Sequence, residues 1–212
     1  MHNEVHADVA DVRKADYPVD AAFLNRWSPR AYSPREVEEE KLMSVFEAAR
    51  WAASSFNEQP WRFIIARSAE DRKRFVDFLA PPNQSWAKNA PVLVLVVSKK
   101  TFSHNGSPNK TYQFDAGAAS AYLALGAQLN GLIAHGMAGF DADQARATTG
   151  LPTDFDPIAV FALGYHGDKS LLDEASAERE LPSGRRPVSE SIMEGHFVPA
   201  AEKAAEDDTE NG

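Results

Sequence analysis

The run Pro91-Val92-Leu93-Val94-Leu95-Val96-Val97-Ser98 decides the fold class of this chain. Its six consecutive aliphatic residues, four of them valine, are typical of a strand that is buried on both faces. Such a strand must be covered by other elements on both sides, because neither of its faces can be left in water. The run therefore predicts a sheet at the centre of a single hydrophobic core.

Extended and helical patterns alternate around this run. Residues 62–66 and 158–163 are expected to form strands, and a fourth strand is expected near Gly195-His196-Phe197-Val198. Residues 70–79 suit a short amphipathic helix, which Pro81-Pro82 is expected to stop. The sum predicts an α+β domain with a central sheet flanked by helices.

Two longer helices complete the pattern. The capping sequence Ser33-Pro34-Arg35-Glu36 predicts the start of one helix, and apolar residues follow at helical spacing as far as Ala53. Asp115 is expected to cap the other, which runs to about His135 and is small or apolar nearly all round. A helix of that composition is predicted to be buried, with its neighbours packed close to its backbone.

The composition of the 212-residue chain predicts a globular protein, with 43% hydrophobic residues and a net charge of -9. The acidic balance argues against nucleic acid or an anionic membrane as the main partner. Cysteine is absent, which removes disulfides, thiolate nucleophiles and iron–sulfur clusters. No signal-like stretch or membrane-length apolar run is evident, so the expected location is the cytoplasm. The expected divisions are an N-terminal arm (1–20), one domain (21–200) and an acidic disordered tail (201–212).

Arginines gather at two places in this acidic chain. Arg26, Ser28 and Arg30 alternate, so an extended backbone would put all three on one face, where they could hold a phosphate. Arg185 and Arg186 follow a turn far away in the sequence. The alternative is that all of these arginines lie in surface salt bridges, and spacing alone leaves that alternative open.

Two further segments could contact a flat heteroaromatic ring. The polar turn Ser54-Ser55-Phe56-Asn57-Glu58-Gln59 leads into a strand, although such residues also simply end helices. Gly136 and Gly139 would let the backbone approach a ring closely, although a helix-ending glycine is equally compatible. The chain has no Gly-rich dinucleotide or phosphate loop, and its histidines lack metal-ligand spacing, so no metal is expected.

Taken together, residues 22–198 resemble the nitroreductase family. The resemblance is carried by five motifs in the family's order: Arg26-x-Ser28-x-Arg30, Ser54-Ser55-x-Asn57-x-Gln59-Pro60-Trp61, Asn89-Ala90-Pro91, Gly136-Met137-Ala138-Gly139-Phe140-Asp141 and Arg185-Arg186-Pro187. It implies an α+β fold with a central mixed or antiparallel sheet and an intertwined homodimer that binds two FMN molecules.

The resemblance also implies a set of FMN contacts. Arg26, Ser28, Arg30 and Arg185 would lie on the phosphate or nearby ring atoms, with Arg186 as a neighbour. Ser54, Ser55 and Asn57 would reach the flavin of the other subunit. On the ring itself, the expected contacts are the side chain of Asn83 at the polar edge and the backbone amides of Ala138 and Gly139 near N5.

The implied activity is transfer of hydride from NADH or NADPH through flavin N5 to an electron-poor acceptor, such as a nitroaromatic or a quinone, with ping-pong kinetics. The cofactor carries the chemistry, so no catalytic side chain is expected. Alternatives are a dehalogenating, flavin-consuming or dehydrogenating enzyme on the same scaffold, or a protein that stores or senses FMN. Trp27, Ala53 and Trp86 depart from the residues that are common in the family at those positions.

Overall fold

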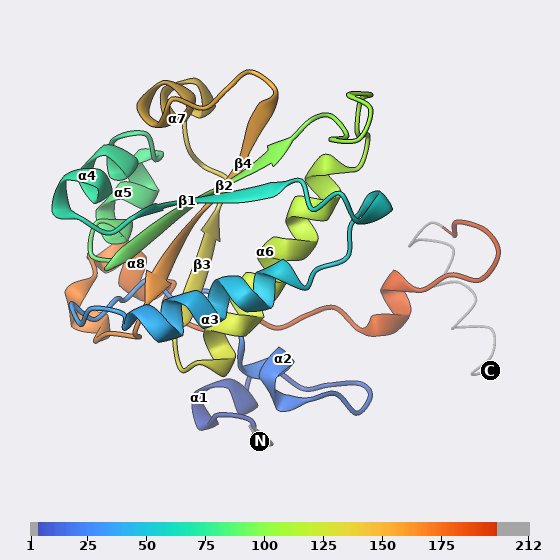
Figure 1. Ribbon diagram of the computed structural model, residues 1–212. Coiled ribbons are helices and arrows are strands. Elements are labelled where there is room, and N and C mark those ends of the chain that lie inside the picture. The colour runs from blue at the N-terminus through green and yellow to red at the C-terminus, as the bar shows by residue number, and fades with distance from the viewer. Residues whose placement is uncertain (1–3, 199–212) are drawn as a thin grey trace.

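The structure of the protein is a computed structural model that describes residues 4–198, so the acidic segment 201–212 lies outside the described residues. Figure 1 shows a central sheet with helices packed on both of its faces. The strands are β1 (Trp61–Ala66), β2 (Val92–Lys99), β3 (Ile133–Met137) and β4 (Phe155–Gly164). The α-helices are α1 (Ala7–Ala10), α2 (Ala21–Asn25), α3 (Glu39–Arg50), α4 (Ala69–Asp77), α5 (Pro81–Ala87), α6 (Tyr112–Leu129), α7 (Ala142–Thr149) and α8 (Glu174–Glu178). Single 3-10 turns lie at Ser55–Asn57, Lys169–Leu171 and Val188–Ser191.

The four strands form one antiparallel sheet in the order β1-β2-β4-β3. Strand β1 pairs along its whole length with β2, from Trp61 opposite Ser98 to Ala66 opposite Leu93, and β2 pairs with β4 on its other side. The α+β class with a central sheet is therefore confirmed, and the sheet is antiparallel throughout its described strands.

The two faces of β2 build two separate cores. Val92, Val94 and Val96 face the layer of α3 and α6, whereas the alternating Leu93 and Leu95 face the layer of α4 and α5. All of them are at most 2% exposed. This alternation is the two-residue period of a strand, and it confirms that the aliphatic run is buried on both faces.

Helix α6 confirms the prediction of a buried helix but differs in its ends. It begins at Tyr112, so Asp115 lies inside its first turn and does not cap it. It ends at Leu129, because Gly131 has a φ of +70° and turns the chain back toward the sheet. His135, which was expected at the end of this helix, instead lies in β3. None of the helices within residues 4–198 combines the length and the apolar character that a membrane span requires.

Two other expectations about the elements were wrong. The segment 33–38 is not helical, because the amide of Ser33 donates to Tyr165 O (2.9 Å) and α3 starts only at Glu39. The helix before Pro81-Pro82 ends at Asp77, as expected, and Pro81 then begins α5, since a first helical position needs no amide hydrogen. Residues 195–198 form no strand, and the fourth strand is β3.

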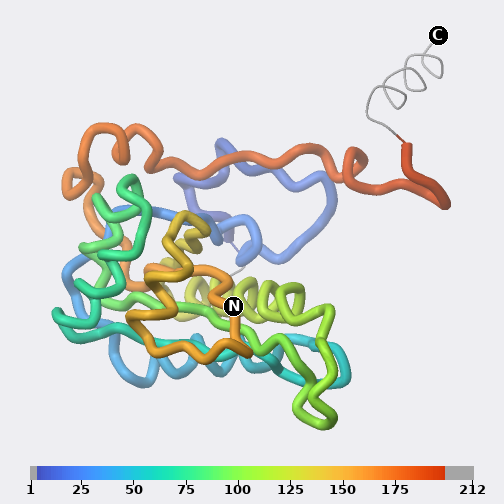
Figure 2. Tube along the Cα trace, turned by 90° about the horizontal axis from the view of Figure 1, so that it is seen from above, coloured from blue at the N-terminus to red at the C-terminus, as the bar shows by residue number. Residues whose placement is uncertain are grey.

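The N-terminal segment lies beside part of the C-terminal segment. Figure 2 shows the C-terminal segment running along the N-terminal segment and then extending away from the body of the protein. Hydrogen bonds join them, from Arg13 to Ser183 O and from the amide of Val188 to Asp16. The N-terminal residues therefore pack against the domain, and Val9 is fully buried. The domain boundaries at 20 and 200 remain predictions.

Helix α6 offers a test of its close packing on α3. A Cβ atom at Gly126 would lie 2.7 Å from Ala48 Cβ, whereas a Cβ at Gly117 meets nothing within 4 Å. We predict that Gly126→Ala lowers the free energy of unfolding by about 1–3 kcal/mol through overpacking. Gly117→Ala, the same change in the same helix, should raise it by roughly 0.5–1 kcal/mol. Urea titrations of the two variants decide this, and equal effects would contradict the packing described.

Candidate functional site

The extended segment from Arg26 to Ala31, which carries three of the predicted phosphate contacts, is held by a buried carboxylate and a half-buried histidine. Glu180 accepts hydrogen bonds from the amides of Arg30 (2.7 Å) and Ala31 (3.0 Å). His135 Nδ1 lies 3.0 Å from Pro29 O. These contacts reach the segment from β3 and from the residues after α8, so its conformation depends on tertiary structure.

Glu180 is a buried carboxylate, only 6% exposed. Burial alone would raise its pKa, but the hydrogen bonds with His166 and with the amides of Ala31 and Arg30 lower the pKa below its ordinary value. The Nε2 atom of His166 lies 3.3 Å from Glu180 Oε1. The ionised form of Glu180 is therefore the one that holds the segment.

His135 packs under the same segment. Burial lowers its pKa, so the imidazole is neutral near pH 7, and its ring lies 4.5 Å from that of Trp86. Because a carbonyl oxygen can only accept, the contact with Pro29 O requires the proton to be on Nδ1. His135 thus serves as a half-buried donor to the backbone of the arginine segment.

Three guanidinium groups gather beside this segment without an acidic partner. Burial and then the charge of Arg185 lower the pKa of both Arg13 and Arg26. None of the ion pairs found within residues 4–198 includes Arg13, Arg26, Arg30, Arg185 or Arg186. The surface salt bridges offered as the alternative for these arginines are therefore not found among the described residues, and the cluster has the charge and the donors to bind an anion.

The side chains of the predicted phosphate contacts do not all point to the same place. Arg30 extends its guanidinium toward Arg179 O (3.0 Å) and lies near Glu180, and burial together with Arg179 lowers its pKa. Ser28 lies on the same segment, where its carbonyl contacts His135. Arg185 donates to the carbonyls of Ser183 and Gly184.

A second group of predicted residues meets where β3 leads toward α7. Asn83 Nδ2 donates to Gly139 O (3.1 Å), and the amide of Ala80 donates to the same oxygen (2.9 Å). A Cβ on Gly139 would lie 3.0 Å from Asn83 Nδ2, so a side chain at this position would require Asn83 to shift. The amide of Phe140 donates to Ala138 O, which forms a tight turn at this point. Asn83, Ala138 and Gly139 are thus brought together.

The Ser54 turn forms a third group. Ser54 Oγ accepts from the amide of Gln59 (3.0 Å), and the amide of Ser55 donates to the buried carboxylate of Asp115 (3.2 Å). Phe56 and Asn57 have φ values of 51° and 55°, a left-handed conformation that is strained for residues with side chains. In Figure 1 this turn lies at the opposite end of the sheet from α5. Within one chain it does not meet the group at Asn83.

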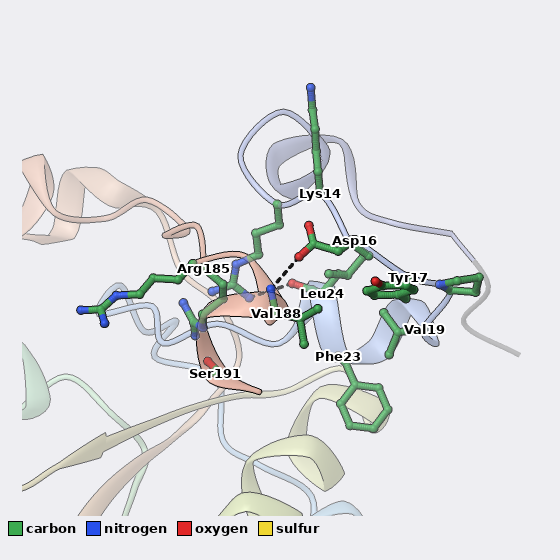
Figure 3. Close-up of a pocket in the computed structure, with 13 residues that line it drawn as sticks. Lys14, Asp16, Tyr17, Val19, Phe23, Leu24, Arg185, Val188 and Ser191 are labelled. Atoms are coloured by element: carbon green, nitrogen blue, oxygen red, sulfur yellow. Dashed lines mark hydrogen bonds between the residues drawn. The ribbon is translucent and has the colours of Figure 1, made fainter. Parts of the chain in front are cut away.

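A cavity of about 660 Å³ lies between the N-terminal and C-terminal segments. Figure 3 shows Tyr17 and Phe23 on one side of it and Arg185 on the other, with the hydrogen bond from Val188 to Asp16 (2.7 Å) across it. The complete lining is Arg13, Lys14, Ala15, Asp16, Tyr17, Pro18, Val19, Phe23, Leu24, Arg185, Arg186, Val188 and Ser191.

Sequence reasoning missed Arg13, Asp115 as an acceptor, and Glu180. Arg13 lies in a polar stretch without a period, and Glu180 ends a charged run that is typical of an exposed helix end. Neither position carries a motif. The sequence feature that could have drawn attention to Arg13 is that basic residues are few in the acidic N-terminal stretch.

The comparisons with known proteins agree with this arrangement. The model of the nitroreductase family matches residues 24–83 and 79–165, which is more than half of the chain. The chain belongs to the nitroreductase family. The matched region contains the Arg26 segment, the Ser54 turn and the Asn83–Gly139 group, whereas Arg13 and Arg185 lie outside it.

Several relatives and solved structures are similar to this nitroreductase-family chain over a large part of its length. A crystal structure described as an oxidoreductase containing FMN is 45% identical, covers 88% of this chain and 96% of its own, and superposes with a TM-score of 0.84. An uncharacterized 15.4 kDa protein of Mycolicibacterium smegmatis is 36% identical over 62% of this chain and 92% of its own length. A protein of Thermus thermophilus named NADH dehydrogenase is 27% identical over 81% of this chain and 93% of its own.

No metal centre is evident in the part of the chain that the structure describes. Within residues 4–198, no group of three or more histidine, aspartate or glutamate side chains is arranged to hold a metal ion.

Glu180 gives a test of how the arginine segment is held. We predict that Glu180→Gln lowers the free energy of unfolding at pH 7 by about 1–3 kcal/mol, because the charge-assisted hydrogen bonds are lost. The pKa of Glu180 is lowered in the folded state, so its contribution is full above the ordinary value of 4.5 and is lost as the pH falls through the lower folded value. The difference from wild type should therefore shrink below pH 4.5.

Chemical denaturation between pH 7 and pH 3 measures this difference. Glu36→Gln is the matched control, because Glu36 is exposed and makes no side-chain hydrogen bond or ion pair to the described residues. A difference for Glu180→Gln that stays constant over this range would show that the carboxylate charge does not hold the segment.

Proposed function

We propose that this chain is a cytoplasmic, FMN-dependent NAD(P)H oxidoreductase that works as a homodimer. The observation that carries the proposal is that Arg26, whose pKa is lowered by burial, lies close enough to Arg185 for the charge of Arg185 to lower that pKa further, while neither arginine forms an ion pair among the described residues. The phosphate of FMN carries nearly two negative charges and fits such a pair of arginines. The 45%-identical structure that contains FMN and the relative named NADH dehydrogenase support the same assignment.

The proposed phosphate contacts lie on two segments. Arg26, Ser28 and Arg30 would hold the phosphate or nearby atoms from one side, and Arg185 with Arg186 would hold it from the other. The support for this is that the Arg26 segment is fixed by Glu180 and His135, so its donors are preorganised before an anion binds.

The proposed ring contacts come from the turn after β3 and from α5. Asn83 would hydrogen-bond the polar edge of the isoalloxazine, and the backbone amides of Ala138 and Gly139 would lie near N5. The support for this is that Asn83 Nδ2 donates to Gly139 O (3.1 Å), so the side chain and the backbone that are assigned to the ring lie together.

The homodimer would supply the remaining contacts. We assign Ser54, Ser55 and Asn57 to the flavin bound mainly by the other subunit, since within one chain their turn lies far from the Asn83 group. The strained Phe56 and Asn57 support a functional role for this turn, because left-handed residues with side chains concentrate at binding sites.

Bound FMN would supply a ring that takes a hydride from NADH or NADPH and passes reducing equivalents to an electron-poor acceptor such as a nitroaromatic or a quinone. The chain's own residues bind and orient the cofactor, and no side chain is assigned a catalytic proton transfer. Because the reductant and the acceptor would use the same face in turn, ping-pong kinetics are expected.

The visible spectrum of the purified protein tests the proposal. We predict a flavin spectrum with one FMN per chain, light scattering at the mass of a dimer, and bleaching when NADPH or NADH is added without oxygen. Re-oxidation by a nitroaromatic or a quinone should then restore the spectrum.

Each result that differs from this prediction would point to a different conclusion. A flavin that neither nucleotide bleaches would favour a protein that stores or senses FMN. Bleaching without re-oxidation by either acceptor would favour a different enzyme on the same scaffold. A colourless protein that also fails to take up added FMN would contradict the proposal itself.

The two arginine segments give a mutational test. We predict that Arg26→Ala combined with Arg185→Ala weakens FMN binding at least about a hundredfold, because two charge-assisted contacts are lost, while the protein stays folded. The matched control is Arg67→Ala with Arg74→Ala, two exposed arginines paired with Glu39 and Glu70. Flavin fluorescence titration and circular dichroism measure both, and tight FMN binding by the first double variant would show that the phosphate site is misplaced.

A further inference from the structure

Arg13 joins the two segments that carry the proposed phosphate contacts. Its guanidinium donates to three backbone carbonyls: Nη1 to Leu24 O (2.8 Å) and Arg26 O (2.7 Å), and Nε to Ser183 O (2.8 Å). The first two carbonyls belong to the N-terminal arginine segment and the third precedes Arg185. Arg13 is only 8% exposed, so these hydrogen bonds are largely shielded from water.

The same contacts put the guanidinium groups of Arg13 and Arg185 close together. Arg185 Nη1 also approaches Ser183 O, at 3.4 Å, so the side chains of Arg13 and Arg185 meet at one carbonyl oxygen. Arg13 Nη1 is bound to the main chain of Arg26 itself. Burial lowers the pKa of Arg13, and the charges of Arg185 and Arg26 lower it further, as expected for like charges in contact.

The hydrogen bonds to main-chain carbonyls explain how Arg13 joins the two segments, but they leave the charges of Arg13 and Arg185 without an acidic partner among the described residues. Holding guanidinium groups together costs free energy unless an anion lies among them. No acid within residues 4–198 forms an ion pair with them, and the carboxylate of Asp16, which lines the same cavity, accepts from the amide of Val188. Arg13 Nη2 makes no hydrogen bond to the described residues, and it is therefore available to a ligand.

We propose that Arg13 is a further phosphate-binding residue, which contacts a bound phosphomonoester through Nη2 and holds the Arg26 and Arg185 segments in register around it. This inference rests on the proposed function, and it assigns to the N-terminal segment a direct part in recognising FMN over unphosphorylated riboflavin. Neither the matched family region nor the sequence motifs contain this residue.

The test compares ligands that differ only in the phosphate. Dissociation constants for FMN and riboflavin are measured by fluorescence titration of the full-length apoprotein, for wild type and for Arg13→Met and Arg13→Lys. The expected result is that Arg13→Met lowers the preference for FMN over riboflavin by roughly tenfold or more. The variant loses the charge-assisted contact with the phosphate and also the hydrogen bonds that connect the Arg26 and Arg185 segments. Arg13→Lys keeps the charge but loses the planar fork, so a smaller loss of several-fold is expected.

Arg146→Met is the matched control. Arg146 also lies partly buried and donates to a backbone carbonyl, that of Pro152 at 2.7 Å, but it belongs to α7 and lies away from the arginine cluster. The preference for FMN over riboflavin should be unchanged in this variant. If Arg13→Met does not fold by circular dichroism, Arg13→Lys decides, and a preference within threefold of wild type in the folded variant overturns the proposal.

A second probe separates this inference from the proposed function. Inorganic phosphate is titrated into the same apoproteins, and the shift in melting temperature is measured. Phosphate binding by wild type that Arg13→Met weakens would support the role of Arg13 even if no flavin bound. FMN binding together with an unchanged preference would overturn the role of Arg13 and leave the proposed function standing. A wild-type protein that bound neither phosphate nor FMN would overturn both.

Discussion

The burial of β2 on both faces is the constraint on which the rest of the structure depends. Its alternating side chains supply one core beneath α3 and α6 and another beneath α4 and α5. At about 25 cal/mol per Å² of apolar surface, such a strand can be stable only where both layers close over it. The closed layers in turn fix the ends of β3 and α5, where Asn83 and Gly139 meet, and they carry His135 beneath the arginine segment.

The candidate phosphate site is built differently from the core. It depends on a few buried or half-buried polar groups that hydrogen-bond the backbone: Glu180 accepts from amides, while Arg13 and His135 donate to carbonyls. Each of these side chains comes from a different part of the chain, so the site exists only in the folded protein. The arrangement also leaves like charges close together, a cost that an anionic ligand would relieve. Strain at Phe56 and Asn57 marks a second place where the fold holds an unfavourable local state.

Prediction from the sequence succeeded where a local pattern and the tertiary structure agree. The β2 run, the amphipathic α4 and the buried character of α6 were all correct, since each follows from a repeating pattern of apolar residues. It failed at the ends of elements. Ser33-Pro34 has the composition of a helix start, yet Ser33 pairs with Tyr165, and the segment around His135 pairs with β4. In both cases a long-range hydrogen bond outweighed a weak local preference.

The sequence by itself determined the fold class, the family and the residue types available for binding an anion and a flat ring. Only the tertiary structure decided which of these residues meet: Asn83 with Gly139, and Arg26 with Arg185, while Arg30 turns toward Arg179. The tertiary structure also brings Arg13 and Glu180 to the site, although no motif contains them. The physical reason is that apolar periodicity is a local property, readable along the chain. The placement of a buried charge depends instead on hydrogen-bond partners more than a hundred residues away, as Ser183 is from Arg13 and Glu180 from Arg30.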